Sequence, residues 1–102
     1  MEEKNQINIE IKPEIAGGKY SNLAIISHSH SEFVLDFAGM FPGQNKPEVV
    51  SRVIMSPEHA KRLLAALNDN IRKYESQFGE ISLDNMPATF NISDLNNNGP
   101  KS

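Results

Sequence analysis

The chain has 102 residues, of which 10 are basic and 13 acidic, so its formal net charge is −3. This length corresponds to one small domain. The lack of cysteine excludes a disulfide framework and a cysteine-type zinc site, and the negative charge argues against direct nucleic-acid binding. The longest apolar runs are too short to span a membrane. Because the polar start MEEKNQINIE lacks the apolar core of a signal peptide, we expect a cytoplasmic protein.

An alternating pattern predicts a strand near the N-terminus. Residues 1–5 are polar and expected to be flexible, and Ile7, Ile9 and Ile11 then alternate with polar residues, as in a half-buried strand. Pro13 cannot donate a hydrogen bond to a sheet and is expected to end this strand. The glycine pair at 17–18 predicts a turn.

Three further strands are predicted at residues 20–28, 32–38 and 48–55. The short segment 29–31 suits a hairpin between the first two. The glycines and prolines of GMFPGQNKP break regular structure before the last strand. The four strands are therefore expected to form an antiparallel meander.

Opposite charges on neighbouring strands set the expected register. If Asp36 lies opposite Arg52, then Val34 lies opposite Ile54 and Ala38 opposite Val50. In the preceding hairpin, we expect Ile26 opposite Val34 and Ile25 opposite Leu35. One face then carries Leu23, Ile25, Phe33, Leu35, Phe37, Val53 and Met55, together with the three isoleucines of the first strand. The opposite face carries Ala24, Ile26, Val34, Ala38, Val50 and Ile54 around the Asp36–Arg52 ion pair. A slip of one residue would reverse these faces.

A long amphipathic helix is predicted from Pro57 to Phe78. Ser56 supplies an N-cap hydroxyl, Pro57 suits the first helical position, and Gly79 suits a left-handed cap. The apolar residues recur at steps of three and four: Ala60, Leu64, Leu67, Ile71, Tyr74 and Phe78. Residues 80–102 show no sustained period and are expected to be a flexible, Asn-rich tail. The predicted fold is therefore one α+β domain at residues 6–79, a four-stranded antiparallel β-meander followed by one long C-terminal α-helix.

The apolar pattern on both sheet faces favours self-association. One helix can cover only one face, and at about 33 Å it overhangs a strand of about 26 Å. A domain this small buries too little surface to leave much spare stability. We therefore expect a homodimer, the commonest symmetric assembly. A solvated second face remains the alternative, and packing on the sheet explains the helix better than a coiled-coil seam.

The candidate chemical groups have simpler structural interpretations. His28 and His30 could hold a metal ion with Glu32 or Asp36, but a solvated turn explains the same residues. Asp36 among apolar neighbours could act as a base, yet an ion pair with Arg52 is the favoured interpretation. We expect no cofactor, no metal site and no enzymatic activity.

The basic side of the helix also has a structural explanation. Lys61, Arg62, Arg72 and Lys73 could contact an acidic partner, but Asp69 lies four residues before Lys73, the favoured order for an ion pair within a helix. We therefore interpret this side as a solvated face.

The loop containing Met40 and Phe41 is a candidate contact site. Aromatic and methionine side chains are enriched in protein interfaces, although these two could equally pack under the sheet. The predicted partner-binding residues are Met40, Phe41, Ile26, Val34 and Ile54.

Two long runs resemble a known family. SNLAIISHSHSEFVLDFAGMFPG and SRVIMSPEHAKRLLAALNDNIRKYESQFGEI are similar, over residues 13–81, to a small bacterial family catalogued as a domain of unknown function. The resemblance transfers no catalytic or binding residue. It implies an association with genes beside those for RNA polymerase subunits. The order of the elements also resembles, in outline, the SecB export chaperone.

These observations lead to three functional hypotheses. The first is a non-enzymatic, self-associating protein-interaction module whose partner belongs to the transcription machinery, with RNA polymerase as the candidate. The second is a SecB-like holdase that binds unfolded segments. The third is a small metal-binding protein or enzyme that uses His28 and His30.

Overall fold

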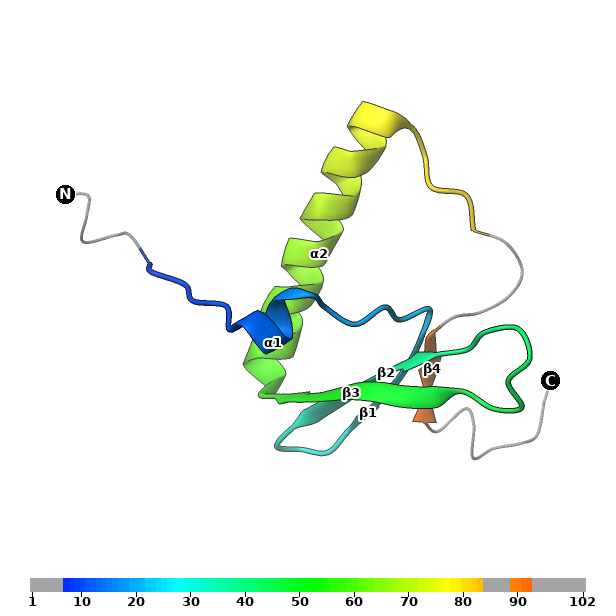
Figure 1. Ribbon diagram of the computed structural model, residues 1–102. Helices are drawn as coiled ribbons and strands as arrows, with labels where there is room; N and C mark the ends of the chain where they lie inside the picture. The colour runs from blue at the N-terminus through cyan, green and yellow to red at the C-terminus, as the bar shows by residue number, and fades with distance from the viewer. Residues whose placement is uncertain (1–6, 84–88, 93–102) are drawn as a thin grey trace.

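The computed structural model describes residues 7–83 and 89–92, and these residues form an α+β fold (Figure 1). The elements in chain order are α1 (Pro13–Ala16), β1 (Leu23–His28), β2 (Phe33–Gly39), β3 (Glu48–Met55), α2 (Pro57–Phe78) and β4 (Thr89–Asn91). The strands lie in the order β3-β2-β1-β4. The three strands β1, β2 and β3 are antiparallel, whereas β4 runs parallel to β1.

The four-stranded meander predicted from the sequence is wrong at its first strand. Residues 7–12 are in no strand, and Pro13 begins the short helix α1 instead of only ending a strand. The proline suits this role because the first residues of a helix need no N–H donor. The alternation of isoleucines is typical of a strand with one buried face, but a strand forms only where a partner strand is available, and the pattern does not indicate one.

A three-residue strand lies within the segment predicted to be a flexible tail. Strand β4 pairs with β1 through Ala24–Thr89, Ile25–Phe90 and Ile26–Asn91. Three residues are too few to show a period, so the sequence does not reveal this strand. The remaining parts of that prediction, residues 84–88 and 93–102, lie outside the described residues, as does the predicted flexible N-terminus at 1–5.

The predicted register of β2 and β3 is confirmed over most of its length. Asp36 lies opposite Arg52 and Val34 opposite Ile54. Ala38, however, lies opposite Val49 rather than Val50, because the register shifts between Phe37 and Ala38. Such a bulge adds one residue to one strand and cannot be read from side-chain pairing.

The predicted register of β1 and β2 is wrong by one residue. Ile26 lies opposite Leu35, and His28 lies opposite Phe33. The turn between them spans four residues, closed by the Ser29 N–H, which donates to the Glu32 carbonyl at 2.9 Å. A turn of four residues instead of three moves every β1 side chain to the other face.

Helix α2 has the predicted bounds. The Ser56 Oγ accepts a hydrogen bond from the His59 N–H at 3.1 Å, so it caps the helix as expected. Gly79 follows the last turn with φ of 101° and ψ of 166°. The positive φ favours glycine, although the ψ differs from the predicted left-handed cap. On the polar side, the Lys73 Nζ lies 3.1 Å from the Asp69 carboxylate, the predicted pair.

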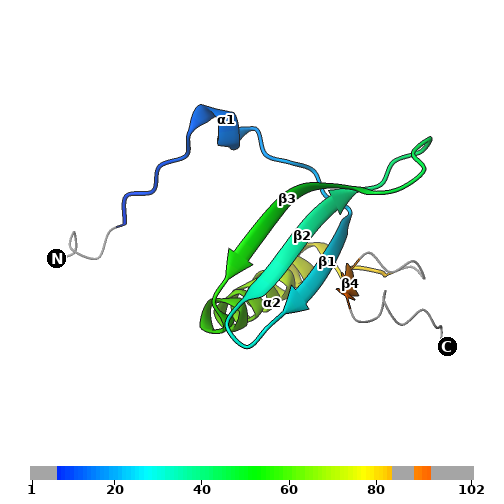
Figure 2. The ribbon, with the colours of Figure 1, turned by 90° about the horizontal axis from the view of Figure 1, so that it is seen from below.

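Helix α2 begins over one face of the sheet and then rises away from it (Figures 1 and 2). An open-sided apolar space of about 310 Å³ lies between them, lined by Ile26, Phe33, Leu35 and Met55 of the sheet and by Ala60, Leu63, Leu64 and Leu67 of the helix. The second half of α2 therefore stands away from the face of the sheet (Figure 1). In the described part of the chain, Ala38 is the one fully buried hydrophobic residue, so this fold has a very thin core.

Candidate protein-interaction surface

The sheet face opposite α2 is uncovered by any described element. We call it the open face, and cross-strand pairing places these side chains on it: Leu23, Ile25, Val34, Asp36, Arg52 and Ile54. Figure 2 views the sheet from this side, with α2 behind it. Ile54, near the end of the outer strand β3, is 55% exposed. Two of the predicted contact residues, Val34 and Ile54, therefore lie side by side on this face.

Ile26 does not belong to this surface. Because of the shifted β1–β2 register, Ile26 shares the face of Leu35 and lines the space beneath α2. Ile25 takes the place that was predicted for Ile26 on the open face, opposite Asp36.

An ion pair lies in the middle of the open face. The Arg52 Nε donates to one carboxylate oxygen of Asp36 at 2.6 Å and a terminal guanidinium nitrogen donates to the other at 2.8 Å. This two-pronged geometry suits arginine and carboxylate. The Asp36 side chain is only 13% exposed, while that of Arg52 is 63% exposed. The pair therefore fixes the β2–β3 register and anchors one charge at an otherwise apolar surface.

The hydrogen bonds from Arg52 hold the pKa of Asp36 below its ordinary value of 3.8, although partial burial opposes this shift. The pair therefore stabilises the folded chain fully at pH values above the ordinary pKa of an aspartate, and this stabilisation is lost as the pH falls through the lowered pKa of Asp36.

Because Arg52 is mostly solvated, we expect Asp36→Asn to cause a small decrease in the free energy of unfolding at about pH 6, and none at about pH 2. Urea titrations at both values measure this. An equal difference at both values would contradict the assignment.

The loop after β2 is anchored at its backbone and exposed at its side chains. The Met40 N–H donates to the Asn22 Oδ1 and the Asn22 Nδ2 donates to the Met40 carbonyl, both at 3.0 Å. The next N–H, of Phe41, donates to the Gln44 Oε1 at 2.7 Å. Met40 and Phe41 remain 41% and 45% exposed. The backbone of this loop is therefore held in place by hydrogen bonds, while the side chains of Met40 and Phe41 are partly exposed to solvent.

Gly39 and Tyr20 set the position of the Phe41 ring. The ring lies 6.2 Å from that of Tyr20, centroid to centroid. It also occupies the space next to Gly39, where a Cβ would come within 2.6 Å of the Phe41 ring. Sequence analysis did not identify Asn22, Gly39 or Tyr20 as supports of this loop, because they lie far from it in the chain or carry no distinctive chemistry.

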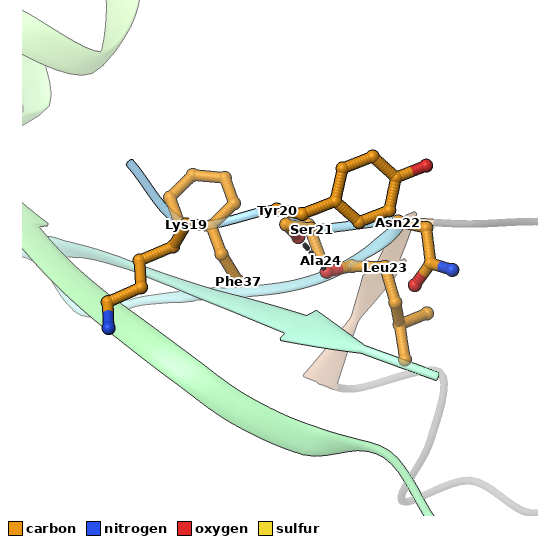
Figure 3. A pocket seen from close by; sticks show the side chains of 7 residues that line it. All are labelled: Lys19, Tyr20, Ser21, Asn22, Leu23, Ala24 and Phe37. Carbon is orange, nitrogen blue, oxygen red and sulfur yellow. Dashed lines mark hydrogen bonds between the residues drawn. The ribbon is translucent and has the colours of Figure 1, made fainter. Parts of the chain in front are cut away.

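A shallow depression of about 580 Å³ lies beside this loop, where residues 19–22 lead into β1 (Figure 3). The Ser21 Oγ lies 2.9 and 3.0 Å from the Leu23 and Ala38 carbonyls, which share its one proton, and Asn22 is hydrogen-bonded to Met40. The Lys19 chain extends away from the Tyr20 ring in Figure 3. The polar lining groups therefore serve the backbone and do not converge on a ligand.

The two histidines of the alternative metal-binding interpretation occupy different environments. The His28 ring stacks on Phe33 with centroids 5.3 Å apart, whereas His30 is exposed in the turn. Within residues 7–83 and 89–92, no group of three or more histidine, aspartate or glutamate side chains could hold a metal ion.

A second apolar surface runs along α2. We call it the helix stripe, and its residues are Leu64, Leu67, Ile71, Tyr74 and Phe78, all exposed. The Tyr74 and Phe78 rings lie 4.9 Å apart at the far end of the helix, where Phe78 is 67% exposed. The periodicity predicted this stripe, but it did not indicate that so much of it would stay uncovered.

Comparison with known proteins identifies the family. None of the helices in the described ranges has the length and apolar character needed to cross a membrane. Searches against curated proteins and against solved structures give no match. A family model described as "Protein of unknown function (DUF3467)" matches residues 1–83. The chain therefore belongs to the DUF3467 family.

Proposed function

We propose that this protein is a non-enzymatic, self-associating interaction module of the cytoplasm. The observation that carries the proposal is the contrast between one buried hydrophobic residue, Ala38, and two exposed apolar surfaces in the described chain. Single folded chains rarely expose large continuous apolar patches unless those patches make contacts. The groups that could suggest chemistry have structural roles, since His28 stacks on Phe33 and Asp36 pairs with Arg52.

The helix stripe is the proposed contact between two copies in a homodimer. It is apolar, and its residues Ile71, Tyr74 and Phe78 lie in the half of α2 that rises away from the sheet. Two such stripes can cover each other across a two-fold axis, because the same patch serves both subunits.

The open face and the loop of Met40 and Phe41 are the proposed contact with a different protein. Half-exposed aromatic side chains on an anchored loop lose little conformational freedom on binding, which favours affinity. The candidate partner is RNA polymerase, from the family resemblance alone.

Phe41→Ala tests this contact. The change removes the exposed ring but leaves the Asn22–Met40 hydrogen bonds that anchor the loop. We expect the affinity for purified core RNA polymerase, measured by biolayer interferometry, to fall at least about tenfold. Lys46→Ala, an exposed change in the same loop, is the control and is expected to bind normally. If the unaltered protein does not bind, RNA polymerase is not the partner.

A SecB-like holdase is the second candidate, favoured by the apolar character of the open face. Such a protein suppresses the aggregation of unrelated unfolded chains, and Ile54→Glu on the open face would abolish this suppression. An interaction module with one specific partner leaves such aggregation unchanged, so an aggregation assay separates the two functions.

A further inference from the structure

Residues 7–12 form an arm that extends away from the rest of the chain. The three isoleucines of this arm are the most exposed group of large apolar residues near the N-terminus: Ile7 is 78% exposed, Ile9 80% and Ile11 63%. In Figures 1 and 2 the arm leaves α1 and points away from the sheet. Three isoleucines alternating with Asn8, Glu10 and Lys12 form a strand pattern that has no partner strand within the described chain.

The sheet has two outer strands in the described chain, β3 and β4. Because β4 has only three residues, the outer side of β3 is the long unpaired edge. Strand β3, with the sequence EVVSRVIM, is eight residues long and contains no lysine or proline. Edge strands usually carry such residues, or a cover, to prevent pairing with other chains. An uncovered edge of this length is a receptor for one more strand.

We propose that the arm of one copy pairs with the free edge of β3 in a second copy, and that the exchange is reciprocal. This inference rests on the self-association proposed above and adds a second contact between the two copies to that of the helix stripe. Reciprocal exchange closes a two-fold dimer, whereas one-way exchange would build a fibre.

The side chains favour one antiparallel register, in which opposite charges pair. If Glu10 lies opposite Arg52, its carboxylate adds to the ion pair on the open face. The isoleucines then lie on the α2 side of the sheet, with Ile7 opposite Met55, Ile9 opposite Val53 and Ile11 opposite Ser51. A slip of one residue would instead place an isoleucine opposite the Arg52 guanidinium, so the pattern of side chains disfavours it.

The segment between the arm and β1 explains why the receptor is a second copy. The N–H groups of Ile15 and Ala16 donate to the Lys12 carbonyl at 2.9 and 3.0 Å, and that of Gly18 donates to the Ile15 carbonyl at 3.0 Å. Gly18 has φ of 80°. In Figure 1 the arm leaves this turn in a direction away from its own β3.

Engineered disulfides test the pairing directly, because the native chain has no cysteine. Asn8→Cys and Ile54→Cys are made in separate full-length proteins, one carrying a longer tag. The two are mixed, unfolded together in urea, refolded and oxidised with oxidised glutathione. Adjacent antiparallel pairs alternate between two spacings, so Ile9→Cys with Val53→Cys is the second test pair. Asn8→Cys with Val53→Cys places the two thiols on opposite faces and is the control.

The proposal predicts a disulfide-linked heterodimer for at least one test pair and at least about a tenfold lower yield for the control. Equal yields, or no heterodimer, would overturn it. A single chain carrying both Asn8→Cys and Ile54→Cys distinguishes a further case: a disulfide within one chain would show that the arm folds onto its own sheet and would also overturn the proposal. Light scattering on the same samples distinguishes a failure of the arm exchange from a failure of self-association. A dimer without the cross-link refutes only the exchange of arms, whereas a monomer refutes self-association as well.

Discussion

Replacing Ile71 with glutamate is expected to convert the dimer into monomers. Ile71 lies within the helix stripe, in the second half of α2, which rises away from the face of the sheet. A carboxylate buried between two such stripes would lose its hydration without gaining a partner. We expect the dissociation constant to rise at least about thirtyfold, which corresponds to about 2 kcal/mol. Sedimentation equilibrium measures this constant.

The helix itself should not suffer from this change, because glutamate has a higher helix propensity than isoleucine. Circular dichroism is therefore expected to show the same helix content. Ser76→Glu adds the same charge to the same end of α2, but on the other side of the helix. That control should remain dimeric, and equal dissociation of both variants would mean that charge, rather than the helix stripe, controls association.

Replacing Ile9 with aspartate is expected to weaken the dimer through the arm. In the proposed register Ile9 lies next to Val53 on the α2 side, so the change removes a buried side chain and introduces a charge. Burial of one isoleucine contributes about 1.5–3 kcal/mol, and a two-fold dimer contains two such sites. We therefore expect at least about a tenfold rise in the dissociation constant measured by sedimentation equilibrium.

Asn8→Asp is the matched control for this second change. It introduces the same charge one residue earlier, on the opposite side of the arm. The control should retain nearly the native dissociation constant. If Ile9→Asp leaves dimerisation unchanged, the arm is not part of the interface, although the contact through α2 could still hold.

The sequence correctly predicted the features that depend on neighbouring residues, namely the bounds of α2 and most of the β2–β3 register. The bounds of α2 follow from the Ser56 cap, the apolar period and Gly79, and each of these lies within the helix or next to it. The pairing of Asp36 with Arg52 likewise fixed the β2–β3 register up to the bulge. Where a structure depends on one segment and its immediate neighbours, the sequence was sufficient.

Features that depend on distant segments were not predicted. The four-residue turn at 29–32 moved Ile26 to the α2 side, and only the turn geometry decides this. Strand β4 is defined by its pairing with β1 and has no pattern of its own. The candidate loop was identified from Met40 and Phe41, but its anchor Asn22 lies 18 residues earlier than Met40. Sequence reasoning found the exposed side chains and missed the residues that hold them in place.

The mass of the native protein in solution tests the central claim most directly. Sedimentation equilibrium across micromolar concentrations is expected to give twice the chain mass of 11.4 kDa, because one chain leaves both its helix stripe and the edge of β3 uncovered in the described residues. A stable particle of one chain mass throughout this range would contradict the account, since it would show that the fold persists without a second copy.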